Sequence, residues 1–226
     1  MGKMNKVLAK AINLTPKQRI IFDEVKKSDF IKDKFYFTGG TALSSVYLNH
    51  RLSEDLDFFS ENKFENLSIL NLLTQWGERH NFKFLLKENE VVKIYLLEFS
   101  DGEKLKVDFG FYPYKRIRNG KTIETVQIDS LFDIAINKLT TIMQRTEVKD
   151  FVDLFYLLKQ FTLWDLMEGV GVKFRIKTDP YLIGINFLKA DVFDQLPNML
   201  KPLELEELKD FYINMAKKLG MRITMK

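Results

Sequence analysis

Cysteine is absent from this chain of 226 residues. Its absence excludes a disulfide framework, a thiolate metal site and a nucleophilic cysteine. Histidine is almost as rare, because His50 and His80 are the only two, and their spacing does not match that of metal ligands. We therefore expect His50 to have a structural role.

Long apolar runs are also missing, since no stretch approaches the roughly 20 apolar residues that a membrane span needs. The segment from Met1 to Lys10 lacks the apolar core of a signal peptide. The formal net charge is only +4, so charge alone gives weak support for polyanion binding. Hydrophobic residues make up 46% of the chain, enough for a real core. We expect a cytoplasmic protein without a membrane segment.

The most informative stretch runs from residue 35 to residue 59. It begins with an apolar run, Phe35 to Phe37, which predicts a short buried strand ending at Gly39 and Gly40. Glycines permit positive φ and close approach of a ligand to the backbone. A helix is predicted next, and its first N–H groups, near Thr41, would attract phosphate. One face of that helix is formed by Ala42, Leu43, Val46, Tyr47 and His50.

Two aspartates follow this helix in a pattern of period two. The alternation predicts a strand that sends Leu56 and Phe58 to the core and both Asp55 and Asp57 to the other face. Adjacent carboxylates repel unless a cation neutralises them, and their oxygens suit Mg²⁺. A bare Asp-x-Asp also occurs on solvated strand edges, so its specificity comes from the glycine turn about a dozen residues earlier. Together they predict a nucleoside triphosphate site.

A third acid is predicted on a later strand. Asp101 and Gly102 form a hairpin signal, and the strand 105–109 that follows places Asp108 opposite its apolar side chains. Asp108 is a candidate to complete the site, and the alternative is a solvent-facing aspartate beside Lys106. Further elements are predicted as helices over 15–28, 67–79 and 203–219, strands over 82–84 and 91–99 with a turn near Asn89, a turn at 179–181, and a helix or buried run over 183–190.

The pattern becomes helical again from Ser130, and Lys138 and Arg145 share the apolar stripe of this helix. Burying an unpaired ammonium is costly, so Lys138 should face a carboxylate or a bound anion at the rim of an interface. The alternative is a snorkelling lysine or a structural ion pair. In the next helix Asp150 and Asp153 lie three residues apart near the N-terminus, where the helix dipole by itself would favour Asp150.

A compact basic loop runs from Lys115 to Lys121. It has two interpretations, a contact to the phosphates of a nucleic acid or a solvated hairpin tip.

The motifs resemble those of a known family. Gly-Gly-Thr-Ala-Leu at 39–43 and Tyr-Leu-x-His-Arg-x-Ser-x-Asp-Leu-Asp-Phe-Phe at 47–59 are similar to the signature of the AbiEii/AbiGii toxin nucleotidyltransferases, in the DNA polymerase β-like superfamily. The similarity continues through Asp133 to Leu139, Arg145, and Lys149 to Leu154. The family pattern often has Gly-Ser where this chain has Gly-Gly-Thr, so Thr41 would have to supply that hydroxyl.

The resemblance implies an α+β fold. A polymerase β-like nucleotidyltransferase core with a mixed sheet flanked by helices would occupy residues 1–127, and a helical C-terminal lobe would occupy residues 128–226. It implies transfer of a nucleoside monophosphate from NTP to an acceptor hydroxyl, with Mg²⁺ or Mn²⁺ as cofactor and the 3′ end of tRNA as the acceptor. It also implies a toxin of a toxin–antitoxin or abortive-infection system, with a cognate antitoxin as partner. Transfer to a protein or small molecule, and an inactive binding module of the same fold, remain open.

The predicted site combines these motifs. Asp55, Asp57 and Asp108 would bind the metal beside the double glycine. The resemblance implies six catalytic residues, namely Asp55, Asp57, Asp108, Lys138, Asp150 and Asp153. It implies nucleotide binding by Gly39, Gly40, Thr41, Arg51, Ser53, Lys138 and Arg145. The sequence does not decide between Asp150 and Asp153 as the active-site acid.

Overall fold

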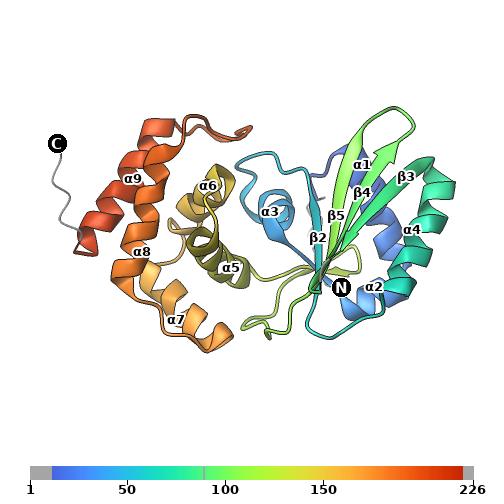
Figure 1. Cartoon of the computed structure of the whole chain (residues 1–226), viewed down its shortest axis with the longest axis horizontal. Helices are drawn as coiled ribbons and strands as arrows, with labels where there is room; N and C mark the ends of the chain where they lie inside the picture. Colours follow the sequence, from blue (N-terminus) through green and yellow to red (C-terminus); the bar gives the residue numbers. More distant parts are fainter. Residues whose placement is uncertain (1–11, 89, 221–226) are drawn as a thin grey trace, which may run out of the picture.

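The computed structural model describes residues 12–88 and 90–220, which form a sheet with helices on both sides (Figure 1). The expected turn at Asn89 and the segment before residue 12 lie outside these residues. The first half contains α1 Pro16–Lys27, α2 Asp29–Lys34, β1 Tyr36–Thr38, α3 Gly39–Ala42, the π-helix η1 Leu43–Leu48, β2 Leu56–Ser60, α4 Asn66–His80, β3 Phe82–Glu88, β4 Val92–Phe99, β5 Lys104–Phe111, β6 Thr122–Ile123 and β7 Val126–Gln127. The second half contains α5 Leu131–Gln144, α6 Val148–Leu157, α7 Leu163–Phe174, α8 Pro180–Phe187, the 3₁₀-helix η2 Leu188–Val192 and α9 Leu205–Lys218.

The main sheet is mixed and has the strand order β1-β2-β5-β4-β3. Strand β2 runs parallel to β5, whereas the other neighbouring pairs are antiparallel. Asp57 on β2 lies opposite Asp108 on β5 in this register. Because side chains alternate between the two faces of a strand, these two carboxylates belong to the same face. The mixed sheet confirms the α+β fold that the sequence predicts.

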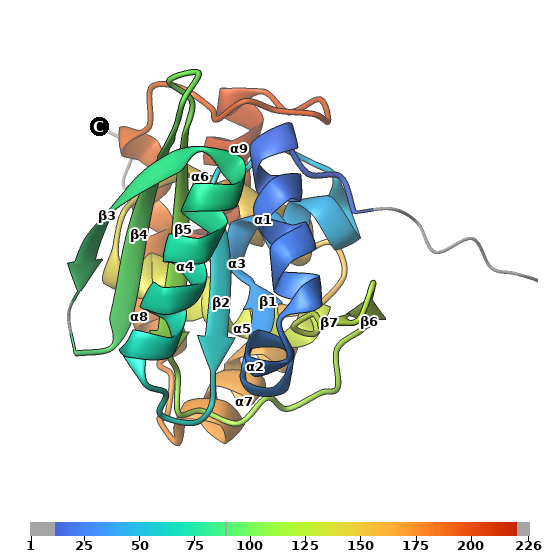
Figure 2. The ribbon, with the colours of Figure 1, turned by 90° about the vertical axis from the view of Figure 1, so that its right-hand side faces the viewer.

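The other face of the sheet carries aromatic side chains under α1 and α4, which lie across it in Figure 2. Phe22 of α1 contacts Phe37 of β1 with ring centroids 5.5 Å apart. Phe37 in turn contacts Phe58, whose ring stacks on Phe109 at 5.4 Å. This apolar layer packs β1, β2 and β5 together, and Asp57 and Asp108 lie on the opposite face.

The start of α1 follows its sequence signal. Thr15 caps the helix with a reciprocal bond pair to Gln18, and Pro16 occupies the first turn, as predicted. Glu24 of the same helix is only 2% exposed, and its carboxylate is paired with Arg79 and His80 of α4. These pairs satisfy a buried charge and fasten α1 to α4.

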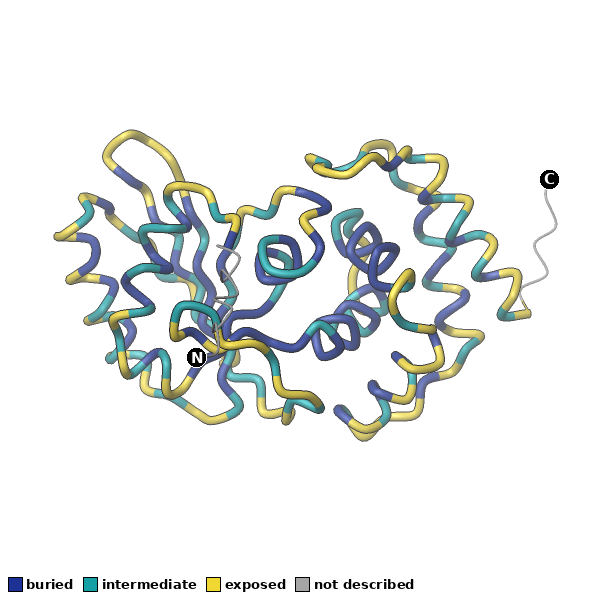
Figure 3. The backbone as a smooth tube through the Cα atoms, turned by 180° about the vertical axis from the view of Figure 1, so that it is seen from behind, coloured by how far each residue is buried: buried dark blue, intermediate teal, exposed yellow. Residues whose placement is uncertain are grey.

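The helices α5 to α9 form a second lobe beside the polar face of the sheet, with α5 and α6 nearest to it (Figure 1). Figure 3 shows buried backbone in the strands and again in α5 and α6. Tyr212 of α9 donates a hydrogen bond of 2.7 Å to the Phe151 carbonyl of α6, which anchors the last helix. Among the helices of the described residues, none is both long and apolar enough to cross a membrane.

Two local predictions need correction. The helix after Gly40 continues as the π-helix η1 and ends at Leu48, where Asn49 adopts a left-handed conformation with φ of 47°. His50 therefore lies beyond the helix and not on its face. The predicted turn at Asp179 is instead the N-cap of α8, with Pro180 in its first turn. Asp before Pro fits a helix start as well as a turn, so the local pattern was ambiguous.

Candidate active site

A cleft of about 460 Å³ separates the polar face of the sheet from α5. It contains most of the predicted site residues and several that the sequence did not indicate. From the sheet and its loops come Gly39, Gly40, Arg51, Ser53, Asp55, Asp57, Lys106 and Asp108, and from α5 and the start of α6 come Asn137, Lys138, Thr141, Gln144, Arg145 and Lys149. Thr41, Asp150 and Asp153 are not part of its lining.

The double glycine forms the floor of the cleft. Gly39 has a φ of +74°, and a Cβ at this residue would overlap the carboxylate of Asp57. A Cβ on Gly40 would lie only 2.6 Å from Nη2 of Arg51. Gly39 thus has the positive φ that the sequence predicts, and a Cβ at either position would require a neighbouring side chain to shift. Thr41 is 2% exposed and donates its hydroxyl proton to the Asp55 carbonyl, so this hydroxyl holds the chain before β2 in place.

Gly39→Ala is expected to remove activity and to destabilise the fold far more than Gly102→Ala. Gly102 has a similar φ of +85°, but a Cβ there meets no atom within 4 Å. Both variants therefore carry the left-handed backbone cost of about 1–2 kcal/mol, whereas only Gly39→Ala also displaces Asp57. Urea unfolding and a nucleotidyl-transfer assay of both variants measure the difference. Equal losses in the two variants would show that the close approach to Asp57 is unimportant.

Asp57 and Asp108 are poorly solvated carboxylates on neighbouring strands. Burial, and after it the charge of Asp108, raises the pKa of Asp57 to about 6. Burial also raises the pKa of Asp108, and the hydrogen bond from Lys106 opposes this shift only in part. Oδ1 of Asp108 is buried and has no hydrogen-bond partner among the described residues. A buried oxygen of this kind is energetically costly unless a proton or a cation satisfies it.

Lys106 brings the third acid into the group. Its Nζ lies 2.7 Å from Oδ2 of Asp108 and 3.4 Å from Oδ2 of Asp55. The sequence contained a signal for this contact, because Lys106 and Asp108 are two residues apart on one strand and must share a face. Sequence reasoning considered Lys106 only as evidence that Asp108 might face solvent.

The donor set fits a hard divalent cation in one respect and not in another. Paired carboxylate oxygens, one of them unsatisfied, are the ligands that Mg²⁺ prefers. However, within residues 12–88 and 90–220 no three acidic or histidine side chains stand close enough to hold a metal ion by themselves. Mg²⁺ commonly uses one or two carboxylates together with water and substrate phosphates. The arrangement therefore fits an ion that takes its remaining ligands from water or from substrate phosphates.

Lys138 crosses from α5 to α6, where its Nζ lies 2.6 Å from both Oδ1 of Asp150 and Oδ2 of Asp153. Both aspartates are fully buried, and Lys138 is 8% exposed. Arg145 adds a bond of 2.7 Å to Asp150. Lys138 was expected to face either a carboxylate or a bound anion, and it faces carboxylates. The same contact is a structural ion pair, which was the alternative interpretation.

Arg51 and His50 complete this network from the other lobe. The guanidinium of Arg51 donates two hydrogen bonds to Asp153, from Nε at 2.7 Å and from Nη2 at 2.8 Å. Nε2 of His50 lies 2.7 Å from the same carboxylate. Although burial opposes ionisation, the charge of Lys138 and the bonds from His50 and Arg51 hold the pKa of Asp153 far below its ordinary value. Burial lowers the pKa of His50, so it is neutral at pH 7. His50 is thus an internal hydrogen-bonding residue, in agreement with the structural role that we expected.

The two candidate acids of α6 therefore occupy different positions. Asp150 is bonded to Lys138 and to Arg145, whose side chain is 47% exposed at the cleft. Asp153 lies deeper and supports Arg51, whose Nη2 underlies Gly40. Asp150 is thus connected to the open side of the cleft, and Asp153 to its floor.

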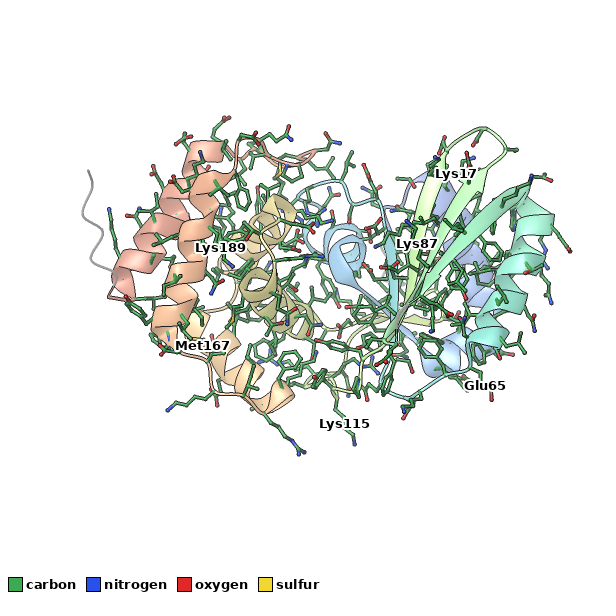
Figure 4. The ribbon with its side chains drawn as sticks, viewed as in Figure 1. Lys17, Glu65, Lys87, Lys115, Met167 and Lys189 are labelled. Carbon is green, nitrogen blue, oxygen red and sulfur yellow. The ribbon has the colours of Figure 1, made fainter. Side chains whose placement is uncertain are left out.

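The basic loop lies outside this cleft. Arg116 pairs with Glu61 at 3.1 Å, and the backbone N–H groups of Ile117 and Arg118 donate to the carboxylate of Asp133. Asp133 also binds Lys173 of α7 at 2.9 Å. Lys115 lies at the lower edge of the molecule in the view of Figure 4. These bonds give the loop a role in joining the sheet to α5 and α7.

Comparison with solved structures places this architecture among nucleotidyltransferase folds. MenT4, a nucleotidyltransferase toxin from Mycobacterium tuberculosis H37Rv, matches with a TM-score of 0.54 and 14% identity over 90% of this chain and 82% of its own. JHP933 from Helicobacter pylori matches with a TM-score of 0.54 and 22% identity over 92% of this chain and 95% of its own. At these identities the matches show a shared fold.

Sequence comparison identifies the family. The family model for the nucleotidyl transferase AbiEii toxin of type IV toxin–antitoxin systems matches residues 25–219. The chain therefore belongs to the AbiEii family and is a toxin nucleotidyltransferase, which confirms the resemblance seen in its motifs. An uncharacterized protein of Aquifex aeolicus (strain VF5) is 34% identical over 159 residues, which make up 69% of this chain and 71% of that relative.

Proposed function

We propose that the cleft transfers a nucleoside monophosphate from an NTP to a hydroxyl at the 3′ end of an RNA, with tRNA as the acceptor, in a reaction that depends on Mg²⁺ or Mn²⁺. The observation that carries the proposal is the register of β2 and β5, which sets Asp57 opposite Asp108 directly above the Gly39 turn. Asp57 and Asp108 would hold a divalent cation, which would supply positive charge for the phosphates of the nucleotide.

The residues of the chain have separate tasks in this proposal. The acceptor oxygen attacks the α-phosphorus, the bond to the β-phosphate oxygen breaks, and pyrophosphate leaves. Asp108 would align or deprotonate the acceptor hydroxyl, because burial raises its pKa and makes it a stronger base than a solvated aspartate. Gly39 and Gly40 allow the phosphates to approach the backbone, with Ser53 beside them in the lining.

The exposed lysine and arginine side chains in the lining of the cleft supply positive charge for the triphosphate. Lys149 lies in the lining with its side chain 40% exposed, and Arg145 is 47% exposed. Both are therefore accessible to a polyphosphate. Lys138 and Arg51 contribute differently, because they are only 8% and 3% exposed and are bonded to buried aspartates. We assign these two to fixing the cleft, with Lys138 close enough to add its field to the bound nucleotide.

The proposal is tested with each of the four labelled NTPs and Mg²⁺, offering total tRNA, a protein extract and small hydroxyl compounds as separate acceptors. We expect label on the 3′ end of tRNA, release of one pyrophosphate per nucleotide added, and no transfer in EDTA. Label only on protein or on small molecules would overturn the RNA acceptor while retaining the enzyme class. Transfer that is unchanged in EDTA would overturn the metal requirement.

A toxin of this family acts with an antitoxin, and we propose that a cognate antitoxin restrains this chain in an abortive-infection setting. Growth arrest on expression that persists in Asp57→Ala would instead favour the alternative of a non-catalytic binding module. Arrest that disappears in Asp57→Ala would support toxicity through nucleotidyl transfer.

A further inference from the structure

Asp55, Asp57 and Asp108 form an acidic group, and the positively charged Lys106 lies beside it. A positive charge at this place does not match the proposed binding of a metal ion. Its ammonium lies between Asp108 and Asp55, at 2.7 Å and 3.4 Å, which is where a cation that neutralises both carboxylates would be expected. The side chain is 34% exposed, so solvent can reach its ammonium. This ammonium would share two carboxylates with the proposed metal.

The group needs such a charge when no divalent ion is bound. Asp57 and Asp108 face one another in register. Asp55 lies directly before β2, the strand that carries Asp57. Carboxylates on one face of a sheet repel one another unless a cation lies among them. Lys138 cannot serve this purpose fully, because its Nζ is bonded to Asp150 and Asp153.

We propose that Lys106 is an internal counter-cation that occupies the acidic group until a divalent ion displaces it, so that the lysine and the metal compete for Asp55 and Asp108. The proposal rests on the metal site of the proposed function and adds a regulatory residue to it. Its physical basis is that an ammonium 2.7 Å from Oδ2 of Asp108 repels a divalent ion bound to the same carboxylate.

The structure offers the displaced side chain a place to go. A second hollow, of about 510 Å³, lies over β3, β4 and β5 and has Asp55 and Lys106 in its wall beside Glu54 and Glu98. Lys106 therefore stands at the border of the two cavities. Rotation of its four-carbon stem away from Asp108 keeps the ammonium in water and near carboxylates, which lowers the cost of the exchange.

The test measures Mn²⁺ binding to the full chain without nucleotide, from the electron paramagnetic resonance signal of free Mn²⁺, for wild type, Lys106→Met and Lys104→Met. Methionine keeps the unbranched stem, one atom shorter, and removes the charge. Lys104 is the matched control, because it is exposed, lies on the same face of β5 and also lines the second hollow. We expect Lys106→Met to bind Mn²⁺ about tenfold more tightly than wild type, since it removes a like charge at contact distance. Lys104→Met should change the Kd by less than about twofold.

A second readout separates displacement from a general change of charge. Without metal, Lys106→Met should melt at a lower temperature than wild type, because its carboxylates have lost their counter-charge, and saturating Mn²⁺ should remove this difference. Lys106→Gln, a polar replacement, provides the same comparison if the methionine variant folds poorly.

Three outcomes would overturn the proposal. One is an unchanged or weaker Kd in Lys106→Met, another is an equal gain in Lys104→Met, and the third is the absence of Mn²⁺ binding in every variant. None of these measurements uses catalysis. A chain that binds Mn²⁺ as expected but labels no acceptor would therefore sink the proposed function and leave the role of Lys106 standing.

Discussion

Asp57→Asn is expected to lower the rate of nucleotidyl transfer by at least about a thousandfold, because it removes a cation ligand and leaves its space filled. Asp57 is the carboxylate that contacts the glycine turn and faces Asp108 across the strand pair. The measurement is single-turnover transfer of labelled NTP at saturating Mg²⁺. Asp194→Asn, which changes an exposed aspartate of the second lobe, is the matched control and should retain the wild-type rate.

The same variant should be at least as stable as wild type, which distinguishes a chemical defect from misfolding. The folded state holds a proton on Asp57 up to a pKa of about 6, against an ordinary value of 3.8. A raised carboxyl pKa means that folding is favoured by protonation, so wild type loses stability as the pH rises from about 4 to 6. Above pH 6 the free energy of unfolding of wild type is lower by about 3 kcal/mol than at pH 4.

Asparagine carries no such charge and should not show the loss. In EDTA, Asp57→Asn should therefore unfold at a higher urea concentration than wild type at pH 8, and the two should converge near pH 4. A rate within tenfold of wild type would rule out Asp57 as a cation ligand. If Asp57→Asn were less stable than wild type at pH 8, the ionised carboxylate of Asp57 would not destabilise the folded state.

Asp153→Asn should have the largest effect on stability. Its carboxylate balances Lys138 and Arg51 in a region where it is fully buried. Removing one partner of a buried ion network leaves the remaining charge uncompensated and costs about 3–5 kcal/mol, so we expect a fall in Tm on the order of 10 °C. Urea unfolding at pH 7 and differential scanning calorimetry measure the two quantities.

The pH dependence identifies the cause. The folded-state pKa of Asp153 is depressed, so its ionised form stabilises the fold at all pH values above the ordinary aspartate range. That contribution decreases as the pH falls below about 4. The gap in unfolding free energy between wild type and Asp153→Asn should therefore be constant from pH 5 to 8 and narrow below pH 4. A gap under about 1 kcal/mol at pH 7, equal to that of Asp194→Asn, would contradict a structural role for this carboxylate.

The local predictions succeeded where one strand or helix determines the answer. Alternation alone placed Asp57 and Asp108 on the polar faces of their strands, and the structure sets them opposite each other. The positive φ that the motif predicts at the double glycine is found at Gly39.

The sequence could not show which charges neutralise each other. Arg51 and Asp153 are separated by 102 positions, and no periodic pattern encodes a contact of that range. Thr41 shows the same limit, because its hydroxyl was expected to serve the phosphate site and is instead bonded to the Asp55 carbonyl. The π-helix η1 was also hidden, since the apolar spacing of residues 43–48 fits an α-helix equally well.

The salt-bridged cluster around Asp153 bears on how the chain can be divided. A cut between residues 127 and 128 would leave Arg51 and His50 on one fragment and Lys138 with its two aspartates on the other. The same cut would separate Phe37 and Thr38 from Asp129, which binds both of them at 2.8 Å. Each fragment would then contain buried charged side chains without their ion-pair partners. We therefore expect fragments 1–127 and 128–226 to reach their native interiors only when they are joined.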